Sequence, residues 1–175
     1  MTAGTSGEGD GLGRDDEFSR FFASRFDQAR RTAYALCGDW VEAEEIAQGA
    51  FVRMYAHWPK VRRESAEAYL RTVVTRLFLD TRRRGRGREQ SVAAPPESAV
   101  DADTSSDERQ PLLAALRHVP PRQRAVLVLR YVHDLSIEQV AEALGCSAGT
   151  VKSQAARGLQ TLREAYRGAA TPETA

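Results

Sequence analysis

Apolar residues recur every three or four positions along most of the chain, which is the spacing of one face of an α-helix. In the N-terminal half this spacing predicts three helices, the first over residues 15–37. The second follows Asp39, which can cap it, and ends at Pro59. The third follows Ser65 and stops at Gly85. Because no segment alternates as a strand does, this half is predicted to be a compact helical domain.

The C-terminal half is predicted to hold four shorter helices, at residues 109–118, 121–132, 136–144 and 148–167. Between the halves, residues 89–108 are rich in Pro, Ser and acids and have little to bury, which is typical of a linker. The predicted fold class is therefore all-α, with two small helical domains at 15–88 and 109–167 joined by a flexible acidic linker. The ends, residues 1–14 and 168–175, are predicted to be disordered.

The last two predicted helices have the pattern of a helix-turn-helix. Ser136 and Gln139 form a capping-box pair at the start, Gly145 supplies a turn, and Ser147 can cap the second helix. Apolar positions then face inward on both helices, and they are Ile137, Val140, Ala141 and Leu144, followed by Val151, Ala155, Leu159 and Leu162. A plain helical hairpin is the alternative interpretation of this pattern.

The helical geometry indicates which side chains of the second helix face outward. At about 100° per residue, Ser153 and Arg157 lie opposite the inward stripe, and Thr150 is also exposed. Lys152 and Gln154 fall on opposite flanks. In a major groove, outward side chains reach base edges and flanking ones meet phosphates. We therefore expect Ser153 and Arg157 to contribute most to sequence preference.

Charge is strongly segregated, although the formal net charge is only +1. Residues 60–88 carry +7, residues 89–110 carry −5 and residues 111–168 carry +4. Two basic segments around an acidic connector indicate two surfaces that face nucleic acid. The five arginines at 82, 83, 84, 86 and 88 would attract phosphates without reading sequence.

Other functional classes receive little support from the composition. No apolar run approaches the length of a membrane span, and the start lacks the layout of a signal peptide, so we expect a cytoplasmic protein without a membrane partner. Cys37 and Cys146 are far apart, and His57, His118 and His133 are isolated. We therefore expect two reduced structural thiols, no metal, no cofactor and no enzymatic activity.

Three stretches, two before the linker and one after it, carry a resemblance to a known family. The stretches "VEAEEIAQGAFVRMYAHW" and "AYLRTVVTRLFLDTRRR" precede the linker, and "VPPRQRAVLVLRYVHDLSIEQVAEALGCSAGTVKS" follows it. Over residues 15–167 the chain resembles an extracytoplasmic-function (group IV) sigma factor of bacterial RNA polymerase. The resemblance implies a promoter-specificity subunit that binds core polymerase, recognises the −35 duplex and the −10 element, and promotes promoter melting.

The resemblance also implies partners and roles for particular residues. The helix at 39–58 would bind the clamp helices of the largest polymerase subunit through Glu42, Glu44, Glu45, Gln48, Phe51 and Arg53. The −10 element would be bound and melted by Arg62, Arg63, Ser65, Tyr69, Arg71, Arg76, Asp80, Arg83 and Arg84. The −35 duplex would be bound by Ser147, Thr150, Lys152, Ser153, Gln154 and Arg157. The flap of the second-largest subunit and an anti-sigma factor are further implied partners.

The chain departs from the family pattern at Gly49, Tyr69, Arg76 and Gln154. Tyr69 is equally suited to base stacking and to core packing. The main alternative function is a stand-alone helix-turn-helix regulator that binds duplex DNA without polymerase, which would leave the acidic helix at 39–58 unexplained. A nucleic-acid-processing enzyme is a weaker alternative, because the sequence shows no metal-ligand cluster or phosphate-binding loop.

Overall fold

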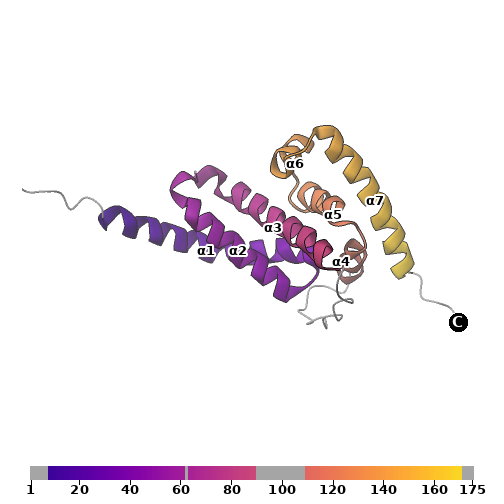
Figure 1. Ribbon diagram of the computed structural model, residues 1–175, viewed down its shortest axis with the longest axis horizontal. Helices are drawn as coiled ribbons and strands as arrows, with labels where there is room; N and C mark the ends of the chain where they lie inside the picture. The colour runs from indigo at the N-terminus through magenta and orange to yellow at the C-terminus, as the bar shows by residue number, and fades with distance from the viewer. Residues whose placement is uncertain (1–7, 62, 90–108, 171–175) are drawn as a thin grey trace, which may run out of the picture.

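A computed structural model describes residues 8–61, 63–89 and 109–170, and within these ranges the chain is helical and contains no strand (Figure 1). The N-terminal domain consists of α1 (Glu8–Cys37), α2 (Trp40–His57) and α3 (Ala66–Glu89). Two short 3₁₀ turns, η1 (Trp58–Lys60) and η2 (Arg63–Ser65), connect α2 to α3. As predicted, Asp39 caps α2, because its Oδ1 accepts from the backbone N–H of Glu42 at 2.8 Å.

Aromatic rings fill one end of the N-terminal domain. Phe51 of α2 is 3% exposed, and the rings of Phe18, Phe21, Phe22 and Phe26 of α1 lie with centroids between 4.9 and 6.2 Å from it. Edge-on and tilted aromatic pairs at these distances add to the burial of apolar area. This packing fixes α2 along α1, and thus fixes which face of α2 is left exposed.

The C-terminal domain consists of α4 (Arg109–Arg117), α5 (Pro121–Leu127), the π-helical turn η3 (Val128–Val132), α6 (Ile137–Leu144) and α7 (Ala148–Ala170). Pro121 occupies the first turn of α5, as predicted. Ser136 and Gln139 form the expected capping box at the start of α6. A separate small core, formed by Val126, Leu129, Val140, Ala143 and Val151, holds α5, α6 and α7 together.

The two domains are in direct contact. Leu116, Val119 and Val128 of the C-terminal domain belong to the same buried cluster as Leu36 and Phe78 of the N-terminal domain. Figure 1 shows α4 to α7 packed beside the α1–α3 bundle, with α3 next to α5. The fold class and the two-domain division are as predicted, and the structure adds that the domains share a core.

Several helix ends differ from the predictions. Helix α1 begins at Glu8 and α7 extends to Ala170, so both enter segments that were predicted to be disordered. Helix α3 continues past Gly85 to Glu89. A single glycine costs a helix only about 1 kcal/mol relative to alanine, and no proline follows within these helices. The central linker residues 90–108 lie outside the described ranges. No helix within those ranges is long and apolar enough to cross a membrane.

Candidate nucleic-acid and polymerase interfaces

The turn between α6 and α7 has the geometry of a helix-turn-helix. Gly145 has a φ of 64°, in the left-handed region that favours glycine, and its N–H bonds back to α6. Ser147 caps α7, because its Oγ accepts from the backbone N–H of Thr150 at 3.1 Å. Beneath the turn, Val140 and Val151 are both fully buried. Both ends of the turn are therefore fixed, and the start of α7 is presented on a rigid support.

The predicted −35 residues lie together at the start of α7, from its cap Ser147 to Arg157 in the third turn. Ser147, Lys152, Ser153 and Arg157 are exposed, whereas Gln154 is half-buried. This placement agrees with Gln154 on a flank of the helix. Thr150 differs from its prediction, because it is half-buried and its Oγ1 lies 2.9 Å from Ser147 Oγ. The side chains of Ser147 and Thr150 therefore fix each other. The exposed side chains that follow them on α7 are Lys152, Ser153 and Arg157.

The predicted −10 residues that the structure describes lie on η2 and along α3, and they are not equally accessible. Ser65, Arg76, Arg83 and Arg84 are exposed. Asp80 is half-buried and accepts from Arg83 at 3.4 Å. Arg71 is half-buried, and Arg76 donates from Nε to the carbonyl of Ala143 in α6 at 3.0 Å.

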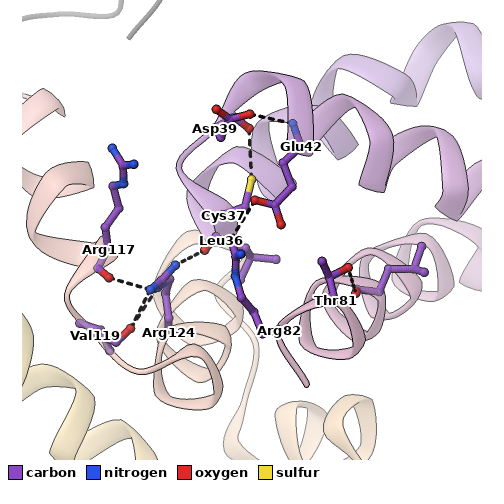
Figure 2. Close-up of polar contacts among 10 residues, drawn as sticks. Leu36, Cys37, Asp39, Glu42, Thr81, Arg82, Arg117, Val119 and Arg124 are labelled. Atoms are coloured by element: carbon purple, nitrogen blue, oxygen red, sulfur yellow. Dashed lines mark hydrogen bonds and ion pairs between the residues drawn. The ribbon is translucent and has the colours of Figure 1, made fainter. Parts of the chain in front are cut away.

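Three of the remaining −10 predictions have different outcomes. Tyr69 is half-buried and packs against the N-terminal core, so core packing accounts for much of its ring. Arg62 lies outside the described residues, and Arg63 is described only as part of the backbone turn η2. Arg82 was predicted to attract phosphates as part of the arginine run, but it is half-buried and pairs with Glu42 at 2.8 Å (Figure 2).

The predicted polymerase residues of α2 divide into a supporting and an exposed set. Phe51 lies in the aromatic cluster, and Glu42 is tied to Arg82, so these two side chains support the helix rather than line its outer face. Glu44, Glu45, Gln48 and Arg53 are exposed, as expected for a surface that meets a partner.

Apolar side chains on the same exposed face of α2 were missed by the sequence reasoning. Val41 and Val52 are each 70% exposed, and Tyr55 is 44% exposed. With Glu45 and Gln48 between them, they follow a spacing of three or four residues, which places them on one stripe of the helix. Exposed apolar residues at helical spacing are typical of a surface that binds another helix. The spacing of these apolar residues along α2 is the signal in the sequence that predicts such a surface.

The thiols and histidines offer no catalytic or metal centre within the described residues. Both cysteines are free. Burial raises the pKa of Cys37 to about 12, and its Sγ donates to the carbonyl of Asp39 at 3.2 Å, so it is an unreactive structural thiol, as predicted. His133 is half-buried between the domains and 3.1 Å from Thr32 Oγ1. The described chain contains no group of three or more His, Cys, Asp or Glu side chains that could hold a metal.

Comparison with known proteins identifies the family. Residues 21–88 match the model of Sigma-70 region 2, and residues 109–162 match the model of Sigma-70, region 4. The RNA polymerase sigma-E factor of Streptomyces avermitilis is 37% identical over 150 residues, which cover 85% of this chain and 84% of the relative. The chain belongs to the extracytoplasmic-function sigma factors. It is thus a promoter-recognition subunit that works with bacterial RNA polymerase.

Further comparisons agree with this assignment. The ECF RNA polymerase sigma factor SigL of Mycobacterium tuberculosis is 31% identical over 141 residues, covering 76% of the sigma factor described here and 79% of the relative. Among solved structures, the sigma factor RpoE of Bartonella quintana, in complex with the anti-sigma factor NepR, has a TM-score of 0.70 at 24% identity. That likeness covers 86% of this chain and 97% of the other, and it supports the fold.

Proposed function

We propose that this sigma factor recognises a −35 duplex through the exposed start of α7 and contacts the melted −10 element through α3. The observation that carries the first half is the exposure of Ser153 and Arg157 directly after a turn fixed by Gly145 and Ser147. Side chains that reach base edges must be exposed and held in a defined direction. Specificity then comes from base contacts, and affinity comes mainly from the arginines.

The second half of the proposal rests on the charge of α3. Arg76, Arg83 and Arg84 are exposed on one helix, and Arg71 lies half-buried beside them. Guanidinium groups bind phosphate oxygens and stack on bases without needing a regular duplex. The helix is therefore suited to hold a separated strand. No step in this activity needs a cofactor or a covalent reaction, so we infer a non-enzymatic subunit.

The third surface is the stripe formed by Val41, Glu45, Gln48, Val52 and Tyr55, which we assign to core polymerase. Its alternation of apolar and acidic or amide side chains suits a helical partner, such as the clamp helices of the largest subunit. Region 4 would in turn meet the flap of the second-largest subunit, and an anti-sigma factor would compete for the same surfaces. We infer a cytoplasmic location, because a subunit of bacterial RNA polymerase acts where the polymerase acts.

The deciding experiment is run-off transcription from a genomic fragment library with purified bacterial core polymerase, with and without this protein. We expect transcripts whose starts share upstream −35 and −10 motifs. The variant Arg157→Ala should weaken them strongly, whereas Arg163→Ala, an exposed arginine later on α7, should not. The absence of any sigma-dependent transcript would refute the proposal.

A separate experiment tests the polymerase surface. Val52→Asp removes an exposed apolar side chain and adds a charge, so we expect loss of co-elution with core polymerase without loss of helix content. Ala23→Asp, an exposed position on α1, is the matched control. Equal binding by both variants would contradict the assignment.

The alternative function, a stand-alone regulator, predicts tight and specific duplex binding without polymerase. A gel shift with and without core enzyme distinguishes this regulator from a sigma factor.

A further inference from the structure

The arginine run at the end of α3 is divided by the way the helix packs. Arg83 and Arg84 are exposed, whereas Arg82 is half-buried. Arg82 follows the fully buried Phe78 by about one helical turn, so both side chains lie on the inward face of α3. The guanidinium of Arg82 lies 5.3 Å from the centroid of the Phe78 ring. The three neighbouring arginines are therefore not equivalent, although all three were predicted to attract phosphates.

Arg82 is bound by a carboxylate of the neighbouring helix. Its Nη2 donates to Oε2 of Glu42, in the first turn of α2, at 2.8 Å (Figure 2). This is the length of a charge-assisted hydrogen bond, which is roughly twice as strong as a bond between neutral groups. The side chains of Arg82 and Glu42 are 34% and 23% exposed, so water screens this pair less than a fully exposed one.

The second oxygen of Glu42 makes the pair difficult to separate. Oε1 is buried and has no hydrogen-bond partner among the described residues. The carboxylate therefore depends on Arg82 to compensate for its burial. If Arg82 turned outward to a phosphate, Glu42 would remain as a partly buried charge without this bond. A DNA phosphate has to offset that cost before it can bind Arg82.

A second cation, Arg124 of α5, lies near the same carboxylate (Figure 2). It is only 7% exposed and donates to the carbonyl of Leu36 in α1. Burial, and after it the charge of Arg82, lower the pKa of Arg124 to about 10, whereas Glu42 acts in the opposite direction. Glu42 thus offsets part of the repulsion between two guanidinium groups. Without its charge this repulsion would grow, and Arg82 is the one of the two that is exposed enough to turn to solvent.

Arg82 also lies where a bound strand could reach it. It lines an open groove of about 440 Å³ beside α3, together with Arg53, Arg76, Arg83 and Arg122. Of the described residues that line the groove, only Asp80 is acidic, and it already accepts from Arg83. A groove lined mainly by one sign of charge attracts ligands of the opposite sign, here phosphates. Arg82 would add to this attraction if Glu42 did not hold it.

We propose that Glu42 withholds Arg82 from nucleic acid, and so limits the number of phosphate contacts that α3 makes with a separated strand. The proposal rests on the assignment of α3 to −10 DNA. Glu42 acts as a permanent substitute for a phosphate, because it offers Arg82 the same kind of charged acceptor. Arg83 and Arg84 remain exposed, so strand binding is weakened but not abolished. Glu42 therefore determines affinity for the strand, although it lies on α2 and not on the DNA-binding helix.

The experiment measures binding of a fluorescein-labelled single-stranded 20-mer to the full chain, by anisotropy at salt concentrations from about 20 to about 150 mM. Glu42→Gln keeps the shape of the side chain and removes its charge, so Arg82 should become available. One added phosphate contact steepens the slope of log K against log salt by about 0.7, which is about an eightfold gain in affinity at about 50 mM salt. The matched control is Glu164→Gln, because Glu164 is exposed on α7 and accepts from Gln160, not from an arginine. It should leave the slope and the affinity unchanged.

A double-mutant cycle separates the release of Arg82 from a general loss of negative charge. In the Arg82→Gln background, Glu42→Gln should give no gain, because no arginine is left to release. Arg82→Gln alone should leave the slope unchanged, whereas Arg84→Gln should reduce it by about 0.7. The inference is wrong if Glu42→Gln gives the same gain in both backgrounds, or if Arg82→Gln alone reduces the slope as Arg84→Gln does.

The outcomes also separate this inference from the proposed function. No gain in Glu42→Gln or in Glu42→Ala, with a normal response to Arg84→Gln, would overturn the withholding of Arg82 and leave the assignment of α3 intact. Glu42→Ala is included because a glutamine oxygen can still accept from Arg82. No response to Arg84→Gln, or no binding by the parent chain at the lowest salt, would contradict the assignment of α3 and the inference with it. Circular dichroism checks that each variant keeps its helix content.

Discussion

Acidification should loosen the contact between the two domains, because His133 is neutral while they are docked. We call this docked arrangement the closed form, and the arrangement with the domains separated the open form. Burial and the nearby Arg71 lower the pKa of His133 from 6.5 to about 4, although Glu67 opposes this. Above pH 6.5 the histidine is neutral in both forms and the closed form has its full stability. Between pH 6.5 and 4 the open form binds a proton that the closed form does not, so the closed form is progressively weakened, and below pH 4 the loss stops.

The size of this effect follows from the two pKa values. Lowering the pH from 7.5 to 5.5 should reduce the closed-to-open ratio by about tenfold, or about 1.4 kcal/mol. This is an upper value, because the ring is only half-buried and solvent screens part of the interaction. Thr32 donates its hydroxyl to the carbonyl of Gln28, so His133 donates to Thr32 in either charge state, and this bond does not offset the effect.

The assay is the distance between spin labels on Ala56→Cys and Gln160→Cys, both exposed, with Cys146 replaced by Ser. It is recorded at several pH values between 7.5 and 5.5. The open population should grow as the pH falls. His133→Gln cannot take up a proton and still offers an N–H to Thr32, so its distribution should be independent of pH over this range. An equal pH response in His133→Gln would refute the reasoning, because another group would then be responsible.

Three further changes have defined expected results. Leu129→Ala, at a fully buried position of the C-terminal core, should lower the free energy of unfolding by about 2–5 kcal/mol in urea titrations; a loss below about 1 kcal/mol would contradict the packing. Gly49→Ala should raise it by about 0.5–1 kcal/mol, because the added Cβ meets only Leu77 at 3.6 Å; a lower melting temperature would argue against this. Gln154→Arg should steepen the salt dependence of duplex binding by about one phosphate contact, and a switch of −35 preference would show that Gln154 is not on a flank.

Local patterns were sufficient to predict most helices. Asp39, Pro121 and the pair Ser136–Gln139 act through neighbours within four residues, so their roles at the starts of helices can be predicted from the sequence. The π-helical turn at Val128–Val132 could not be predicted in this way. It leads into Asp134, whose φ is 53°, and Arg130 reaches the carbonyl of Leu135 across it. These contacts depend on how α6 folds back.

The candidate interfaces were predictable only where the placement of a residue depends on helical spacing alone. Ser153 and Arg157 follow from helical spacing alone and are exposed as expected. Phe51 and Glu42 have the residue types of a partner surface, but their burial depends on α1 and α3. Arg124 looks like an ordinary surface arginine in a basic run, and only the tertiary structure brings it to Leu36, 88 positions earlier. Interdomain contacts of this kind leave no periodic signal.

The shared core limits how freely such proteins can be recombined. One way to design a new −35 preference is to transplant region 4 from a relative as if it were an independent module. In this chain Leu116, Val119 and Val128 complete a cluster that contains Leu36 and Phe78. A transplanted domain that differs at those three positions would change how the two domains of the chimaera pack, as well as its promoter choice. Grafting only the exposed residues of α7 would change the preference and leave the packing between the domains unchanged.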